Sequence, residues 1–330
     1  MSMDRLPPYG LFPDFYREHG EGDGKTPGDW PGVGTPAGEQ AFKDWRDDRM
    51  AAIRDNLWPE WIDGQGWYGA AASKAYAMTE HEIAAMTVEF SKSDILERIP
   101  GHSSFHYTQK DHFEYEDLRI IGSIKEDLES KGVQPKIGHN FFFYDDTPSD
   151  PAEQARIIEI LSDSYTKKTN QFYFWFKDRL MRPRPLQAAL IVGQLEFTSR
   201  RAFSGMHSSI VSGHASTGIL IRCGVLERWL DDGDVPEGLL KSFSQYIVDV
   251  GDRRVFAGVH YPTDNISSWV LALELIPNVF PKHHVKIGQI VRNAIQEHSA
   301  VYEVIDRVYR KDSALAHTVD FLDHYLKAQV

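Results

Sequence analysis

Three short groups of polar residues in the second half of the chain carry side chains that could together bind a tetrahedral oxyanion and move protons at it. The groups supply three cations, a hydroxyl, a glycine, two histidines and a carboxylate. In chain order these residues are Lys177, Arg184, Ser212, Gly213, His214, Arg254, His260 and Asp264. Phosphate and its mimic vanadate are the oxyanions that suit such a set.

The first group is Lys177 followed, after six residues, by Arg184 and Pro185. Lysine offers a mobile point charge, and arginine offers a planar fork that matches two oxygens of an oxyanion. A helix ending near Met181 would present Lys177 from its last turns. Taken alone, this group fits a solvated basic helix end at least as well, because the helix dipole favours cations there.

The second group, Ser212-Gly213-His214, opens an apolar run with the pattern of a helix. Ser212 can cap that helix, and Gly213 lets the backbone approach a ligand closely. Free N–H groups at a helix start favour an anion, and His214 could transfer protons near neutral pH. An ordinary Ser-Gly helix start with an incidental histidine explains the group equally well on its own.

The third group places Arg254, His260 and Asp264 within one short stretch. Arg254 is expected on the last turns of one helix, with His260 after it and Asp264 beyond Pro262. Asp264 can accept a hydrogen bond from one ring nitrogen of His260, which fixes the tautomer and leaves the other nitrogen free. Asp264 could instead be a plain N-cap of the next helix, or could serve in both ways.

The three groups together are far more informative than each one alone. With residue frequencies near about 5%, all three in this order are expected on the order of once in 10⁴ to 10⁵ unrelated chains. Their chemistry is also mutually consistent. The set therefore predicts a functional oxyanion pocket.

This ordered set resembles the signature of the type 2 phosphatidic acid phosphatase superfamily, which includes bacterial class A acid phosphatases, membrane lipid phosphatases and vanadium-dependent haloperoxidases. The resemblance covers residues 177–264, and residues before about 150 match nothing recognisable. The stretch at 181–185 (MRPRP) looks most like the class A acid phosphatases, and the stretch at 258–262 (GVHYP) looks like the superfamily at large. The stretch at 212–215 (SGHA) is similar to either other branch.

The resemblance implies a phosphomonoesterase that forms a phosphohistidine intermediate and needs no metal cofactor. His260 would be the nucleophile, Asp264 would orient it, and His214 would donate and accept the proton. The remaining motif residues would hold the phosphate oxygens. Val211 and Arg253 depart from the family pattern, which usually has Pro and Ser there, and the export signal typical of class A enzymes is missing.

Two other functions remain open at the level of the sequence. In a vanadium-dependent haloperoxidase the same pocket would hold vanadate as cofactor, with His260 as its ligand, His214 assisting peroxide and His207 as a candidate neighbour. The other open possibility is a non-catalytic phosphate-binding protein that is descended from such enzymes. The retained His214, His260 and Asp264 argue against the non-catalytic reading, and the first group favours a phosphatase over a haloperoxidase.

Composition limits the partners. The formal charge of −12 argues against a nucleic-acid binder, and no apolar run approaches the roughly 18 residues of a membrane span. Met1–Gly10 does not have the pattern of a secretory signal, which predicts a cytoplasmic protein, or a periplasmic one if a leader was removed. Cys223 is the only cysteine, so no intrachain disulfide can form, and its apolar surroundings predict a core residue. The predicted partner is a small-molecule phosphate ester.

The elements that must position these residues are helical. The predicted fold is all-α: a single-domain helical bundle of the phosphatidic acid phosphatase and haloperoxidase type, with an irregular Gly/Pro-rich arm at 1–38, a catalytic domain at 39–330 and the motif core at 170–277. Apolar spacing and capping signals predict the following helices: 39–57, one opened by a Thr79–Glu82 capping box, one starting at Asp150-Pro151, 170–181, 214–229, 239–252, 265–275, 283–298 and 301–327. The best strand signal, 136–144, is short. The N-terminal half either covers the pocket and sets specificity or builds the interface of a homo-oligomer.

Overall fold

The computed structural model describes residues 25–59, 77–90, 151–169, 172–199, 208–233, 235 and 237–328. Over these residues the chain is all-α, without strands, as the sequence predicts. The arm before residue 25, the strand signal at 136–144 and His207 lie outside the described residues. None of the described helices is long and apolar enough to cross a bilayer.

The first helices of the described part pack around the later ones. They are α2 (Pro36–Leu57), α4 (Ala77–Glu89), α9 (Pro151–Ser164), which continues as a π-helical turn (Tyr165–Thr169), α10 (Tyr173–Leu180) and α11 (Pro185–Ile191). Helix α2 begins three residues earlier than expected, because Thr35 caps it with its side chain and Pro36 occupies its first position. Trp30, which precedes α2, is buried against Phe42 and Trp45.

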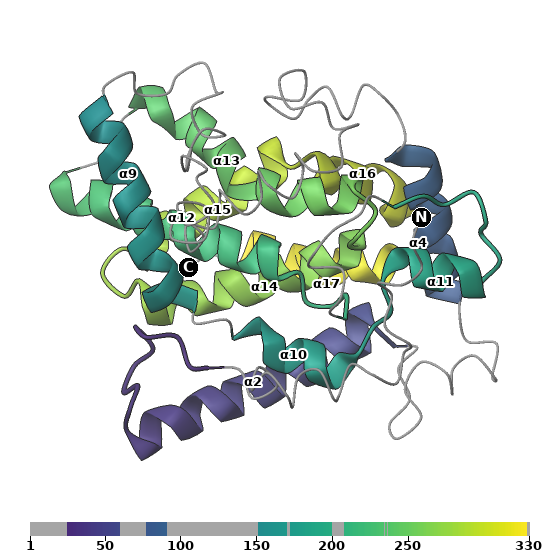
Figure 1. The fold of residues 1–330 in the computed structure, drawn as a ribbon, viewed down its shortest axis with the longest axis horizontal. Coiled ribbons are helices and arrows are strands. Elements are labelled where there is room, and N and C mark those ends of the chain that lie inside the picture. Colours follow the sequence, from purple (N-terminus) through teal and green to yellow (C-terminus); the bar gives the residue numbers. More distant parts are fainter. Residues whose placement is uncertain are drawn as a thin grey trace, which may run out of the picture.

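The later helices form the centre of the molecule. They are α12 (Gly213–Asp232), α13 (Glu237–Phe256), α14 (Pro262–Val279), α15 (His284–His298), α16 (Ala300–Val308) and α17 (Ala316–Lys327). Helices α12 and α14 lie side by side through the middle, and α2 and α10 lie below them in the view of Figure 1. Cys223 of α12 is buried, which confirms it as a core residue, and burial raises the pKa of its thiol.

Helix α14 is buried nearly all round, is largely apolar after its first two turns, and contacts α12, α13, α15 and α17 as well as α2. A helix with this pattern needs neighbours on every side, because each exposed apolar face would cost free energy. Residues at its first turn are therefore held from several directions. This is the turn that carries Asp264.

Three expectations about helix boundaries are wrong. Thr79 does not cap α4 but lies inside it, because Glu82 points into the core instead of back to the helix start. Asp264 is not the N-cap of α14: Tyr261 is, and Asp264 is the third helical residue. The helix expected at 301–327 is interrupted by a 3₁₀ turn (Tyr309–Lys311), at which the fully buried Tyr309 donates a hydrogen bond to Glu82.

Candidate active site

The third group of motif residues lies at the tight connection between α13 and α14. The backbone N–H groups of Val259 and His260 both donate to the carbonyl oxygen of Arg254, at 3.2 and 3.3 Å, which folds the chain back over the end of α13. Gly258 makes this turn with φ at +71°, and a Cβ there would lie 2.7 Å from the carbonyl oxygen of Thr198. The connection requires glycine, and it delivers the His260 ring beside the first turn of α14.

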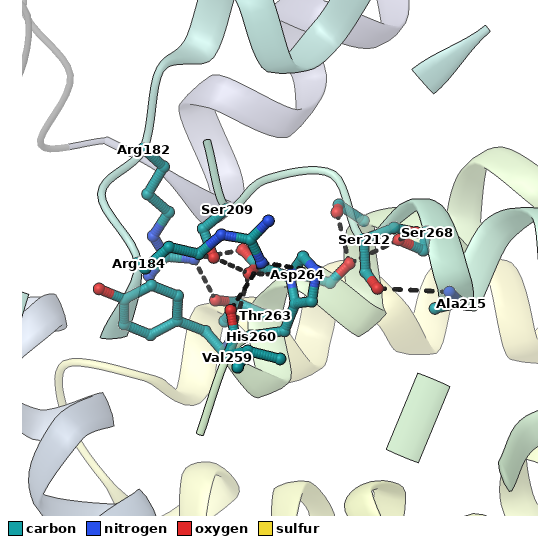
Figure 2. Close-up of polar contacts among 12 residues, drawn as sticks. Arg182, Arg184, Ser209, Ser212, Ala215, Val259, His260, Thr263, Asp264 and Ser268 are labelled. Atoms are coloured by element: carbon teal, nitrogen blue, oxygen red, sulfur yellow. Dashed lines mark hydrogen bonds and ion pairs between the residues drawn. The ribbon is translucent and has the colours of Figure 1, made fainter. Parts of the chain in front are cut away.

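Asp264 holds the inner side of His260. Its Oδ2 accepts from His260 Nδ1 at 2.8 Å, from the Tyr261 N–H at 3.1 Å and from the Ser209 hydroxyl, while its Oδ1 accepts from Arg182 Nη1 at 3.0 Å. Figure 2 shows these side chains converging on the carboxylate. Burial alone would raise the pKa of Asp264, but the hydrogen bond from His260 and the charge of Arg182 outweigh it and lower that pKa. Asp264 is therefore a carboxylate, and the proton of the pair lies on His260 Nδ1.

Arg184 lies on the outer side of His260. Its Nη1 lies 2.9 Å from His260 Nε2 and also donates to the carbonyl oxygen of Val259 at 2.7 Å. Because a guanidinium can only donate, His260 Nε2 accepts and keeps its lone pair directed outward. Burial first, and the charge of Arg184 second, lower the pKa of His260, although Asp264 opposes them. His260 is thus a neutral imidazole whose Nε2 carries the lone pair.

Lys177 reaches the same region from the last turn of α10, as the sequence predicts. Its ammonium donates to the carbonyl oxygens of Ser208 and Ser209 at 2.7 and 3.0 Å. Among the described residues no carboxylate forms an ion pair with it, and burial, followed by the charge of Arg184, lowers its pKa. A buried ammonium with neutral partners is a favourable binding partner for an anion.

The second group opens α12. Ser212 is its N-cap, as predicted: its hydroxyl accepts from the Ala215 N–H at 3.3 Å, and its carbonyl oxygen accepts from the Ser268 hydroxyl at 2.9 Å (Figure 2). Gly213 packs under Tyr173, and a Cβ at this position would lie 2.6 Å from a carbon of that ring. The backbone amides at this helix start are thereby held in a fixed orientation.

His214, the next residue, is partly exposed and is paired with Arg254. Arg254 Nη2 lies 2.6 Å from His214 Nε2, so this ring nitrogen also accepts and the ring is neutral. Partial burial lowers the pKa of His214, and the charges of Arg254, Lys177 and Arg184 lower it further.

The structure thus brings the sequence-predicted residues to one place. Lys177 comes from α10, Arg184 from the start of α11, Ser212, Gly213 and His214 from the start of α12, Arg254 from the end of α13, and His260 and Asp264 from the entry to α14. Among the described residues no cluster of three or more His, Cys, Asp or Glu could hold a metal ion. A cavity of about 510 Å³ between α9 and α12 is lined by none of these residues.

Several residues of the site were not predicted. Arg182 and Ser209 bind Asp264, and Glu82 binds Arg182 through Nη2 at 2.7 Å. In the sequence, Arg182 stands out only as part of the stretch at 181–185 and Glu82 only as part of an expected capping box, and nothing marks Ser209. Comparisons with protein-family models, curated proteins and solved structures found no match to this chain.

Proposed function

We propose that this protein is a phosphomonoesterase that hydrolyses a phosphorylated small molecule through a phosphohistidine intermediate. The observation that supports it most directly is the state of His260, whose Nδ1 is bound by Asp264 while Nε2 lies beside Arg184. A neutral imidazole held by a carboxylate and facing cations is suited to attack an electrophile that carries negative charge.

The first step would transfer the phosphoryl group to the enzyme. The phosphate oxygens attract the guanidinium groups of Arg184 and Arg254 away from the two imidazoles, and Lys177 and the amides at the start of α12 bind oxygens as well. His260 Nε2 then forms a bond to phosphorus while the ester P–O bond breaks. Asp264 stabilises the positive charge that develops on His260.

His214 would provide the proton for the leaving alkoxide. It is neutral beside Arg254, and the negative charge of a bound phosphate ester raises its pKa, so that it takes up a proton together with the substrate. After the alcohol leaves, neutral His214 accepts a proton from water. The water oxygen attacks phosphorus, the N–P bond breaks and inorganic phosphate is released. Such proton transfer contributes about 10²–10⁴ in rate.

The test is release of phosphate from a generic aryl phosphate by vanadate-free protein, compared with two variants. One is His260→Ala, and the control is His284→Ala, which removes a partly exposed histidine that bonds the carbonyl oxygen of Pro281. Hydrolysis that His260→Ala abolishes, that His284→Ala retains and that added vanadate blocks supports the proposal. Absence of hydrolysis across acidic to neutral pH refutes it.

The same Nε2 lone pair beside Arg184 could bind vanadate, which favours a vanadium-dependent haloperoxidase as the second candidate. Bromide oxidation by vanadate-loaded protein with peroxide, in the absence of phosphatase activity, would establish that function instead. Tight phosphate binding without either reaction would indicate a non-catalytic phosphate-binding protein.

A further inference from the structure

Arg182 lies between two carboxylates that are far apart in the chain. Its Nη2 donates to Glu82 Oε2 at 2.7 Å and its Nη1 to Asp264 Oδ1 at 3.0 Å, and all three side chains are fully buried. The ring centroids of Trp58 and Tyr261 lie 5.0 and 3.7 Å from the guanidinium carbon. The guanidinium is therefore held in one orientation by two anions and two aromatic rings.

That orientation decides which oxygen of Asp264 is left for His260. A guanidinium beside a carboxylate prefers to bind both oxygens at once. Glu82 binds Nη2, and the one contact of Arg182 with Asp264 runs from Nη1 to Oδ1. Oδ2 remains available to His260 Nδ1, at 2.8 Å.

Glu82 is itself held by three other contacts. Its Oε1 accepts from the Thr263 N–H at 2.9 Å and from the Tyr309 hydroxyl at 3.1 Å, and its Oε2 accepts from the Thr263 hydroxyl at 2.8 Å. Two of these contacts join the carboxylate to the first turn of α14, one residue before Asp264. Glu82 is therefore tied to the same helix turn that carries Asp264, the other carboxylate bound by Arg182.

We propose, as a consequence that rests on the function proposed above, that Glu82 of α4 is a positioning residue for the nucleophile. It fixes Arg182 so that Asp264 binds that arginine through one oxygen and His260 through the other. Without the Glu82 charge, Arg182 is expected to turn and bind both oxygens of Asp264, which weakens the hydrogen bond from His260 Nδ1. Glu82 lies nearly a hundred residues before the first of the three motifs, and it acts through Arg182 rather than on the substrate.

The test is Glu82→Gln in the full chain. The amide keeps the size of the side chain and one oxygen for the Thr263 N–H, but its NH₂ group faces a donor of Arg182. We expect kcat for aryl phosphate hydrolysis to fall about 10- to 100-fold, the usual effect of losing a residue that orients a catalytic group. Inhibition by inorganic phosphate should stay within about threefold, because Glu82 does not contact the oxyanion.

The second readout is the NMR signal of the His260 Nδ1 proton, which is assigned by its absence in His260→Ala. A hydrogen bond to a carboxylate places this proton far downfield, and the signal should move upfield in Glu82→Gln. The other charged and titratable groups facing His260 are Arg184, Lys177 and His214, and the substitution leaves all three in place. A shift of this signal therefore reports the Asp264 side of the ring.

Glu89→Gln is the matched control. Glu89 lies on the same helix and is also a carboxylate bound by an arginine: its Oε2 accepts from Arg307 Nη2 at 2.6 Å. This variant should keep both kcat and the His260 signal. Equal losses of kcat and thermal stability in the two variants would mean that Glu82 only holds α4 in place, which overturns the proposal.

The two readouts separate this proposal from the proposed function. If wild-type protein hydrolyses phosphate esters while Glu82→Gln leaves kcat and the His260 signal unchanged, the positioning role is refuted and the phosphatase function stands. If wild-type protein has no phosphatase activity but the signal moves only in Glu82→Gln, the phosphatase function is refuted and the positioning role stands.

Discussion

Replacing Asp264 with asparagine tests whether this carboxylate sets the state of His260. An amide has one acceptor oxygen, whereas Asp264 accepts four hydrogen bonds, from His260, Arg182, Ser209 and the Tyr261 N–H. Either the NH₂ group faces His260 and forces the wrong tautomer, or it faces Arg182 and leaves His260 bound to a neutral oxygen. Both orientations remove the negative charge beside the nucleophile.

The size of the effect follows from this geometry. The carboxylate and imidazolium charges are about 4 Å apart, and at an effective dielectric constant of about 20 their attraction is about 4 kcal/mol. In the proposed mechanism this attraction stabilises the phosphohistidine, so losing it should slow the reaction by about 10³-fold. With the wrong tautomer the loss approaches about 10⁴-fold, as for the same substitution in Ser-His-Asp hydrolases. Asp264→Asn should therefore lower kcat by about 10³- to 10⁴-fold.

Stability should change much less. If the NH₂ group faces Arg182, that guanidinium still has Glu82 and the Thr263 hydroxyl, at 2.7 Å each, so the expected loss is about 1–3 kcal/mol. The dependence on pH should also change. The pKa of Asp264 is lowered on folding, so its contribution is complete above the unfolded-state pKa of about 3.9 and is lost as the pH falls through the folded-state value. Asp264→Asn should therefore lose less stability on acidification than the wild type does.

The assay is aryl phosphate hydrolysis with rapid quenching in base, in which phosphohistidine survives, together with thermal unfolding at several pH values. Asp323→Asn is the control, because this buried aspartate also pairs with cations, Arg310 and Lys327, but lies on α17 without a contact to His260. A folded Asp264→Asn variant with kcat within about tenfold of wild type would falsify the role of Asp264.

Three further predictions concern His214 and Gly213 of the site and the buried Asp252 of α13. Because burial and Arg254 lower the pKa of His214, kcat/KM should be highest at acidic pH and fall through neutrality; a rate that rises towards about pH 8 contradicts His214 as the proton donor. Gly213→Ala should weaken inhibition by phosphate and destabilise the fold by about 1–3 kcal/mol, because the new Cβ meets the Tyr173 ring at 2.6 Å; an unchanged inhibition constant and Tm would show that the ring moves freely. Burial, and then Asp249, raise the pKa of Asp252 to about 8, so wild-type stability should decline from about pH 4 to about pH 8, and Asp252→Asn should remove that decline in Tm.

The sequence predicts the helices around the motifs because these have strong local signals. Ser212 caps α12, as predicted. Pro185 and Pro262 occupy the first positions of α11 and α14, but no helix is expected at 185–191, and the later helix is expected to begin only at 265. The apolar pattern at helical spacing then supplies the remaining elements. Local signals of this kind are sufficient to place Lys177 and Arg254 on the last turns of their helices.

The residues that support the motif residues have no such signal. Glu82 follows Thr79 at capping-box spacing, and only the folded chain shows that its carboxylate bonds Arg182 and Thr263 instead. Likewise, α16 ends at Val308 and the next residue, Tyr309, bonds Glu82 through its buried hydroxyl, a contact that nothing in the sequence around Tyr309 indicates. Contacts between side chains so distant in the chain depend on tertiary packing, which overrides local preference.

The first turn of α14 connects the fold and the candidate site through two backbone amides. The Tyr261 N–H donates to Asp264, and the Thr263 N–H donates to Glu82, so these two protons are protected from exchange with solvent deuterium only while both carboxylates are in place. Exchange at these amides consequently measures how often the support of the nucleophile opens, without substrate or turnover. A ligand that binds only the closed arrangement should slow both exchange rates by the same factor.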